Sequence, residues 1–246
     1  MLIERIKRKI EPGLGITPGT TPVVYFGNYE KAKVCTVSLN PSNIEFVNNR
    51  RGILLDNLNK ERLCSRIKLN KRDDEELSDS EAEQVLQYCN NYFQLRPYSW
   101  FNNLEHFIKR FNGYSYKNGT CVHLDLVQWA TTPKWNDLDV DIRQKHIDND
   151  KPVLLHLLEK NFEYIFLNGR TVAETVFDHL GIARKEITTS YSNINSNDVK
   201  RIKIYCGKYN NSKVLGWNLT LQNSVPGENN IQLFCDLIKN NIKEVF

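Results

Sequence analysis

The sequence predicts an α/β protein with a mostly parallel sheet that is covered by helices on both faces. Short apolar runs, typical of buried strands, alternate along the chain with stretches of helical periodicity, which favours right-handed crossovers between parallel strands. The chain has 246 residues, of which 40% are hydrophobic, and this suffices for one substantial core. We therefore expect a single domain over residues 1–246.

Six segments have the composition of strands. Four apolar runs are expected to form buried strands, and two further runs are candidates for edge strands. The buried runs are residues 34–39, 121–127, 164–167 and 214–221, and the edge candidates are residues 23–26 and 202–205.

Five segments have the periodicity of helices. They are residues 80–93, 99–111, 151–161, 171–180 and 229–242. Ser80 is the candidate N-cap of the first, and the fourth ends before Gly181, which are typical boundary signals. The charged run 68–83 is expected to be an exposed excursion, and the Asn-rich patches 191–197 and 209–211 are expected to be loops.

Composition points to a cytoplasmic protein. No run approaches the roughly 18 apolar residues of a membrane-spanning helix, and the first eleven residues mix charged with isolated apolar ones, unlike a secretory signal. The six cysteines lie far apart with no C-x-x-C pair, so we expect reduced thiols, no zinc or iron–sulfur centre, and no cofactor. The net charge of +4 permits a polyanionic partner without requiring one.

Several enzyme classes are disfavoured because their motifs are missing from the sequence. No G-x-G-x-x-G follows an expected strand, and G-x-x-x-x-G-K-[ST], H-E-x-x-H and G-x-S-x-G do not occur. The H-x-E and P-C-x-x-C pattern of zinc deaminases is also missing. Dinucleotide enzymes, P-loop proteins, zincins, elbow-type esterases and zinc deaminases are therefore not expected.

Function in open parallel sheets gathers at the carboxyl ends of the strands. The first expected strand ends in Ser38-Leu39-Asn40-Pro41-Ser42. The proline stiffens a turn that leaves the Asn40 amide at the sheet edge, where it can position a water. The turn itself is common, so a purely structural role is the alternative.

The second expected strand carries His123 and Asp125, and Trp129 follows it. A carboxylate inside an apolar run is costly unless it has partners or a function. His123 alternates onto the same face as Asp125. A structural carboxylate and an ordinary core histidine are the alternatives.

The last two strand ends carry further polar residues. The third strand leads into Asn168-Gly169-Arg170, and Arg170 is either a phosphate contact or a surface cation. After the fourth strand come the polar Gln222, Asn223 and Ser224 and the apolar tip Val225-Pro226. Such a cluster suits a phosphate grip followed by a wedge between base steps, and a simple turn is the alternative.

Taken in order, these four motifs resemble the uracil-DNA glycosylase superfamily, especially its mismatch-specific uracil/thymine branch. That branch carries G-[IL]-N-P-G, T-N-[IM]-V-x-R-x-T-P, a strand followed by G-K, and [NM]-P-S. The corresponding segments here are Ser38-Leu-Asn-Pro-Ser42, Leu124-Asp-Leu-Val-Gln-Trp-Ala-Thr-Thr-Pro133, Asn168-Gly-Arg170 and Gln222-Asn-Ser224. The resemblance covers residues 34–227. It implies a three-layer α/β/α sandwich around a four-stranded, mostly parallel sheet, and a metal-free hydrolase that flips a base out of double-stranded DNA and leaves an abasic site.

The resemblance also implies roles for individual residues. Asn40 matches the water-positioning residue, Phe46 is the expected stacking ring, and Ser224 matches the phosphate-gripping serine. Val225 and Pro226 match the wedge. Further residues are expected to line the base pocket or to contact DNA. Those of the pocket are Ser38, Leu39, Ser42, His123, Trp129 and Asn168, and those on DNA are Gln222, Asn223, Arg50, Arg51 and Arg170.

Asp125 departs from the superfamily pattern, which places at this position an asparagine that reads the uracil edge. An ionised carboxylate only accepts hydrogen bonds, so it repels uracil O4 and favours an exocyclic amino group, as on cytosine. Normal cytosine must be spared, so we expect a modified cytosine. This resembles antiphage glycosylases that excise glucosylated hydroxymethylcytosine from viral DNA.

Three alternatives stay open at this stage. Asp125 is either the reader of the base or the general base that activates the water. Repair of uracil or mismatched thymine is an alternative activity, and a catalytically silent DNA-binding module is another, because Gln222-Asn223 replaces the conventional His/Asn-Pro step. Basic residues near the first and last motifs fit a DNA surface. They are Arg62, Arg66, Lys68, Lys71, Arg72, Lys200, Arg201 and Lys203.

Overall fold

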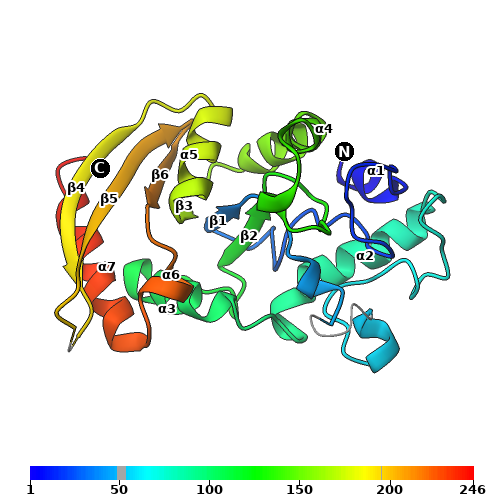
Figure 1. Ribbon diagram of the computed structural model, residues 1–246, viewed down its shortest axis with the longest axis horizontal. Coiled ribbons are helices and arrows are strands. Elements are labelled where there is room, and N and C mark those ends of the chain that lie inside the picture. The colour runs from blue at the N-terminus through cyan, green and yellow to red at the C-terminus, as the bar shows by residue number, and fades with distance from the viewer. Residues whose placement is uncertain (49–53, 195) are drawn as a thin grey trace. The chain divides into compact units, whose positions relative to one another are not determined.

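The computed structural model describes residues 1–48, 54–194 and 196–246. Within these residues, six strands form one mixed sheet in the order β2-β1-β3-β6-β5-β4 (Figure 1). The strands are β1 (Val34–Ser38), β2 (Cys121–Asp125), β3 (Tyr164–Asn168), β4 (Lys185–Ser192), β5 (Val199–Tyr209) and β6 (Ser212–Trp217). The prediction of an α/β protein is confirmed, whereas the prediction of four strands is wrong, because the β4–β5 hairpin extends the sheet beyond β6.

The strand directions divide the sheet into two kinds of pairing. β1 pairs parallel to β3, and β3 pairs parallel to β6. β5 runs antiparallel to both β6 and β4. The amide of Lys33 donates to Thr120 near the start of β1 and β2, and the amide of Val127 donates to Leu39 beyond their ends, as expected of two strands running in the same direction.

Two helices of the described residues, α1 and α6, were not predicted, and the other five differ from the prediction mainly at their starts. They are α1 (Leu2–Lys7), α2 (Asp79–Asn91), α3 (Phe101–Asn112), α4 (Val140–Leu158), α5 (Arg170–His179), α6 (Leu221–Ser224) and α7 (Glu228–Ile242). Ser78, and not Ser80, caps α2 in a reciprocal capping box with Glu81. α4 begins at Val140 and not at residue 151, because its first turns bury His146 and Asp150, which a hydrophobic pattern does not count.

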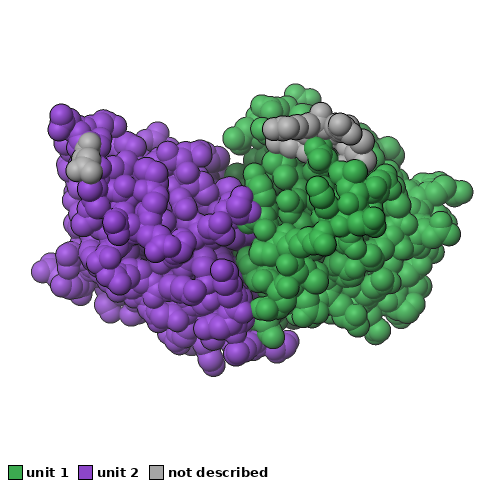
Figure 2. Space-filling view, turned by 90° about the horizontal axis from the view of Figure 1, so that it is seen from below, with its two compact units in different colours: residues 1–29, 39–98, 123–160 green, residues 30–38, 99–122, 161–246 purple. Residues whose placement is uncertain are grey.

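The chain divides into two compact units, which Figure 2 draws in different colours. Unit 1 comprises residues 1–29, 39–98 and 123–160, and unit 2 comprises residues 30–38, 99–122 and 161–246. β2 begins in unit 2 and ends in unit 1. The single domain stays a prediction.

In unit 2, helices pack on both faces of the β3–β6 part of the sheet. On one face the ring of Phe107 on α3 packs against Phe166 and Trp217, with centroids 5.7 and 4.6 Å away. Phe234 on α7 lies 5.7 Å from the Trp217 ring. Gly216 faces the opposite side, where a Cβ would lie 3.0 Å from Ala173 of α5. A larger residue at this position would crowd Ala173, so glycine suits the close approach of α5 to the sheet.

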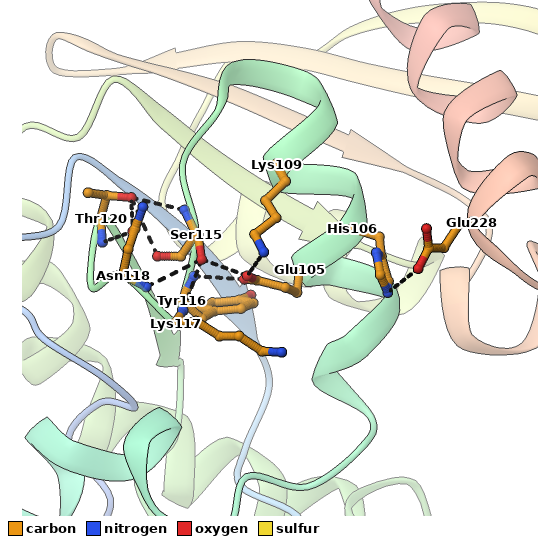
Figure 3. Close-up of polar contacts among 9 residues, drawn as sticks. All are labelled: Glu105, His106, Lys109, Ser115, Tyr116, Lys117, Asn118, Thr120 and Glu228. Carbon is orange, nitrogen blue, oxygen red and sulfur yellow. Dashed lines mark hydrogen bonds and ion pairs between the residues drawn. The ribbon is translucent and has the colours of Figure 1, made fainter.

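A buried carboxylate on α3 holds the turn that leads into β2 (Figure 3). Glu105 accepts a 2.6 Å hydrogen bond from the Ser115 hydroxyl and a 2.8 Å bond from the Tyr116 amide. Lys109, one helical turn along, lies 3.1 Å from the same carboxylate. Cys121, the first residue of β2, then donates its amide to Ser115. This network fixes where β2 begins.

Candidate functional site

The amide of Asn40 is anchored through its nitrogen, two residues after the end of β1. Nδ2 donates to the carbonyl of Trp129 at 3.2 Å, to the hydroxyl of Thr131 at 3.2 Å and to the carbonyl of Pro41 at 3.1 Å. No donor among the described residues bonds to Oδ1. The side chain is half-buried. Its carbonyl oxygen is therefore a fixed acceptor, available to a water or a ligand.

A second set of contacts holds the segment that receives the Asn40 amide. Asp150 on α4 accepts a 2.8 Å hydrogen bond from the amide of Gln128 and forms a buried ion pair with Arg5 of α1. The Arg5 guanidinium also lies 5.5 Å from the centroid of the Trp129 ring. The Trp129 side chain is thus a packing element of unit 1, and its carbonyl is what reaches Asn40.

Asp125 ends β2 and is buried, with only 1% of its surface exposed. Neither carboxylate oxygen has a hydrogen-bond partner among the described residues. His123 lies on the same face of the strand, as alternation predicts, with its Nε2 3.5 Å from Asp125 Oδ1. A buried carboxylate without a donor costs a few kcal/mol, roughly 1–3 in proteins. Such a group in a folded protein points to a missing donor, which a ligand can supply.

Asp125 and Asn40 both contact the segment of residues 128–131 in unit 1. The backbone carbonyl of Asp125 accepts a 3.1 Å hydrogen bond from the Gln128 side chain. The next residues of this segment, Trp129 and Thr131, accept from Asn40. Asp125 therefore begins the loop of residues 125–131, and the Asn40 amide bonds to the end of the same loop.

A second buried carboxyl group, Glu45, lies near Asp125, and the sequence analysis did not identify it. It ends the 3₁₀ turn Asn43–Glu45, which Ser42 caps, and only 3% of its surface is exposed. Tyr92 donates a 2.7 Å hydrogen bond to its Oε2. Burial raises the pKa of Glu45 to about 7, and the nearby charge of Asp125 acts in the same direction. A sequence signal existed, since Glu45 stands between the apolar Ile44 and Phe46.

The predicted stacking ring, Phe46, is buried in unit 1, with 2% of its surface exposed. Its backbone carbonyl accepts a 2.7 Å hydrogen bond from Leu55. Stacking on an extruded base requires that this ring become accessible, and the role stays a prediction. Of the other predicted residues around this turn, Leu39 is buried, Ser38 is half-buried and Ser42 is exposed.

A pocket of about 520 Å³ opens beside the Asn40 turn in unit 1. Asn43 and Thr132 lie on its wall and are joined by a 3.0 Å hydrogen bond. The remaining lining combines polar, charged and apolar side chains. They are Thr17, Pro18, Gly19, Val47, Asn48, Leu54, Ile67, Lys71, Arg72 and Asp73. Its volume lies within the roughly 300–1,000 Å³ typical of small-ligand sites.

In unit 2, Asn168 has a structural role. Its Oδ1 accepts from the Trp217 indole and from the Leu221 amide, both at 3.0 Å, and its Nδ2 donates to Gln222 at 2.8 Å. Gln222 in turn donates to the carbonyl of Trp100. These bonds fix the connection between β6 and α6, so both side chains are already engaged within the protein.

The predicted tip presents fewer side chains than the motif implies. Asn223 and Pro226 are exposed and Ser224 is half-buried, whereas Val225 is fully buried. Lys200 of β5 donates to the carbonyl of Ser224 at 3.3 Å, which brings one of the predicted cations to this tip. In this conformation Pro226 is the apolar residue available as a wedge.

The predicted DNA-contacting cations fall into three groups. Arg50 and Arg51 lie outside the described residues. Arg170, the first residue of α5, is exposed. Arg66 is fully buried and donates to four backbone carbonyls, so assigning it to the surface was wrong.

Comparisons of this chain with protein-family models, with curated proteins and with solved structures find no match. All six cysteines are free and buried. In the described part of the chain, no cluster of three or more His, Cys, Asp or Glu side chains is arranged to bind a metal ion. None of the described helices has both the length and the apolar character needed to cross a membrane.

Proposed function

We propose that this chain is a monofunctional DNA glycosylase with a three-layer, glycosylase-like fold. It extrudes a base from DNA, hydrolyses the N-glycosidic bond and leaves an abasic site. Asp125 carries the proposal, because its two buried oxygens lack any donor among the described residues. The amino group of an extruded base is a donor of the right kind, since an ionised carboxylate only accepts.

The order of polar residues along the chain supports the same function. Asn40, Asp125, Asn168 and the 222–226 tip each follow or end a strand of one α/β sheet. β1, β3 and β6 are parallel, so their carboxyl ends reach the same edge of the sheet, where ligands bind in folds of this class.

The chemistry assigned to these residues is modest. Cleavage passes through an oxocarbenium-like sugar, so the site needs a positioned water and a stabilised leaving base. Asn40 holds the water through Oδ1, the atom that its anchored nitrogen leaves available. No lysine of the four motifs is placed to form a Schiff base, so strand cleavage by the protein itself is not expected.

A modified cytosine is the proposed substrate. A carboxylate accepts from the exocyclic amino group of cytosine and repels uracil O4. The pocket beside the Asn40 turn gives space for a bulky adduct, and its hydroxyl, amide and charged side chains are suited to the hydroxyl groups of a sugar. An antiphage role then follows, because modified cytosines of this kind mark viral DNA.

The test is base release from a panel of duplexes. They carry uracil, a G·T mismatch, 5-hydroxymethylcytosine or its glucosylated form, and abasic sites are revealed by alkali. We expect cleavage of the glucosylated duplex first. Cleavage of uracil or G·T alone identifies the repair enzyme instead. Binding without any base release identifies a silent DNA-binding module.

Two substitutions separate the assigned roles. Asn40→Ala removes the water acceptor and is expected to lower the rate at least about 100-fold. Asn90→Ala is the matched control, since Asn90 is a half-buried amide of unit 1 that bonds only to Tyr25 in the described contacts. Asp125→Asn is expected to shift the preference toward uracil. Loss of all activity without a change of preference would make Asp125 the general base.

A further inference from the structure

Glu45 is a buried carboxyl group that has no role in the mechanism proposed above. It follows the Asn40-Pro41-Ser42 turn directly and precedes Phe46. Tyr92 fixes its position, because the Tyr92 hydroxyl donates to Glu45 at 2.7 Å while accepting a 2.9 Å bond from the Tyr98 amide. The carboxyl group is therefore held in one orientation inside unit 1.

The surroundings of Glu45 raise its pKa, although two of the neighbouring groups act in the opposite direction. Burial is the largest influence and raises its pKa to about 7, and Asp125 adds to this effect. The Tyr92 hydrogen bond and the Arg62 cation oppose it. Arg62 is bound nearby, donating at 2.7 Å to the carbonyl of Ile44. With a pKa of about 7, Glu45 is protonated in about half of the molecules at neutral pH, and this form can donate a proton.

We propose that Glu45 is the general acid that protonates the leaving base, an inference that rests on the glycosylase function proposed above. Glu45 and Asp125 are buried in the same unit and interact electrostatically. One carboxyl group that donates and one that accepts match the cytosine edge, where the amino group at C4 donates and N3 accepts. Uracil has an acceptor at O4 and a donor at N3, the reverse of cytosine, so Glu45 and Asp125 together also select cytosine over uracil.

The reaction balances with these groups and one water. The bond between C1′ and N1 breaks, and its electron pair passes to the base. Glu45 transfers its proton to N3 of the base and becomes a carboxylate. The water held by Asn40 adds to C1′ of the oxocarbenium ion and releases a proton. That proton restores Glu45 through solvent, and the neutral base leaves.

Glu45→Gln tests proton transfer specifically, because glutamine retains an N–H donor at the same place but cannot release a proton. We expect base release from the glucosylated duplex to fall about 100-fold or more, with DNA binding retained. The wild-type rate is expected to fall as pH rises above about 7, and this alkaline limb is expected to vanish in Glu45→Gln.

Tyr92→Phe provides a second, independent readout. The Tyr92 hydrogen bond lowers the pKa of Glu45, so its removal is expected to move the alkaline limb to higher pH. A merely structural role for Glu45 would leave the limb in place. Tyr116→Phe is the matched control, since Tyr116 is a buried tyrosine of unit 2 whose hydroxyl bonds to the Thr36 hydroxyl. It is expected to leave the pH profile unchanged.

These experiments distinguish failure of the general-acid role of Glu45 from failure of the proposed glycosylase function. If the wild type releases the base and Glu45→Gln is equally active with the same pH profile, then only the general-acid role of Glu45 is overturned. No base release by the wild type from any duplex overturns the glycosylase and the general acid together.

Discussion

At the residue scale, two of the carboxyl groups that unit 1 buries, Glu45 and Asp125, lie under different conditions. Glu45 accepts a hydrogen bond from Tyr92, whereas Asp125 has no donor among the described residues. The Tyr92 hydrogen bond offsets part of the cost of burying Glu45. In the described part of the chain, Asp125 has only the His123 ring, with Nε2 3.5 Å from Oδ1, and a buried carboxylate without a hydrogen bond lowers the stability of the fold.

The raised pKa of Glu45 predicts a pH dependence of folding. An acid that holds its proton more tightly when folded contributes stability below its unfolded pKa, near 4.5, and loses it as pH rises through the folded value of about 7. Relative to Glu45→Gln, the wild-type free energy of unfolding is expected to fall by roughly 3 kcal/mol between pH 4.5 and 8. Urea denaturation across this range measures it.

Glu244→Gln serves as the control for this comparison, since Glu244 is an exposed glutamate at the end of unit 2. Its unfolding free energy is expected to follow that of the wild type at every pH. If the difference in unfolding free energy between wild type and Glu45→Gln were the same at every pH, the raised pKa of buried Glu45 would be contradicted.

The sequence identified some of these residues and missed others for physical reasons. Asp125 was recognisable because a carboxylate interrupts an apolar run. Glu45 was missed although it stands between two apolar residues, because a single acid in a short turn usually lies on a solvated face. Arg5, one residue of a short helix, gives no local sign that it pairs with Asp150, far along the chain. Contacts of this kind depend on tertiary packing.

At the element scale, Arg66 organises the segment before α2. Its guanidinium donates to the carbonyls of Thr20, Arg72, Glu75 and Arg8, at 2.6 to 3.2 Å. These bonds tie the charged excursion 68–78 to the N-terminal segment. The excursion is exposed in large part, as predicted, but it is not loosely attached.

Arg66→Met is therefore expected to destabilise the protein by about 3 kcal/mol, because it leaves four carbonyls without their donor. Arg72→Met is the control, since that guanidinium is 76% exposed and its loss is expected to have little effect. The midpoint of urea denaturation measures both. Equal effects of the two substitutions would contradict the anchoring role.

The predicted elements agree with the structure where the apolar pattern is strong. β1, β2 and β3 lie within or close to their predicted ranges, and so do α2, α3, α5 and α7. β4 was missed because its residues are mostly exposed and give little apolar signal. Residues 23–26 form no strand of the sheet, and only Phe26 bridges to His123. Edge strands are defined by their neighbours more than by their own sequence.

At the scale of the whole molecule, the pocket beside the Asn40 turn gives a test of substrate size. Ile67 lines it and is 48% exposed, so Ile67→Trp is expected to fill the pocket without loss of a core contact. We expect it to slow release of glucosylated hydroxymethylcytosine about 10-fold or more while sparing the unglucosylated base. Rates on the two duplexes measure the difference.

Leu95→Trp is the matched control for this substitution. Leu95 also belongs to unit 1 and is 46% exposed, but it does not line the pocket. It is expected to leave both rates unchanged. If Ile67→Trp slowed base release equally from both duplexes, the glucosyl group would not occupy this pocket.

The burial of all six thiols has a practical consequence for the chain as a whole. Burial raises the pKa of Cys64 and Cys89 to about 12 and that of Cys206 and Cys235 to about 11, and it raises those of Cys35 and Cys121 as well. Maleimide dyes attack accessible thiolates. One cysteine introduced on the surface of each unit would then be labelled rapidly while the six native thiols react slowly, so a pair of fluorophores can be attached without replacing any native cysteine.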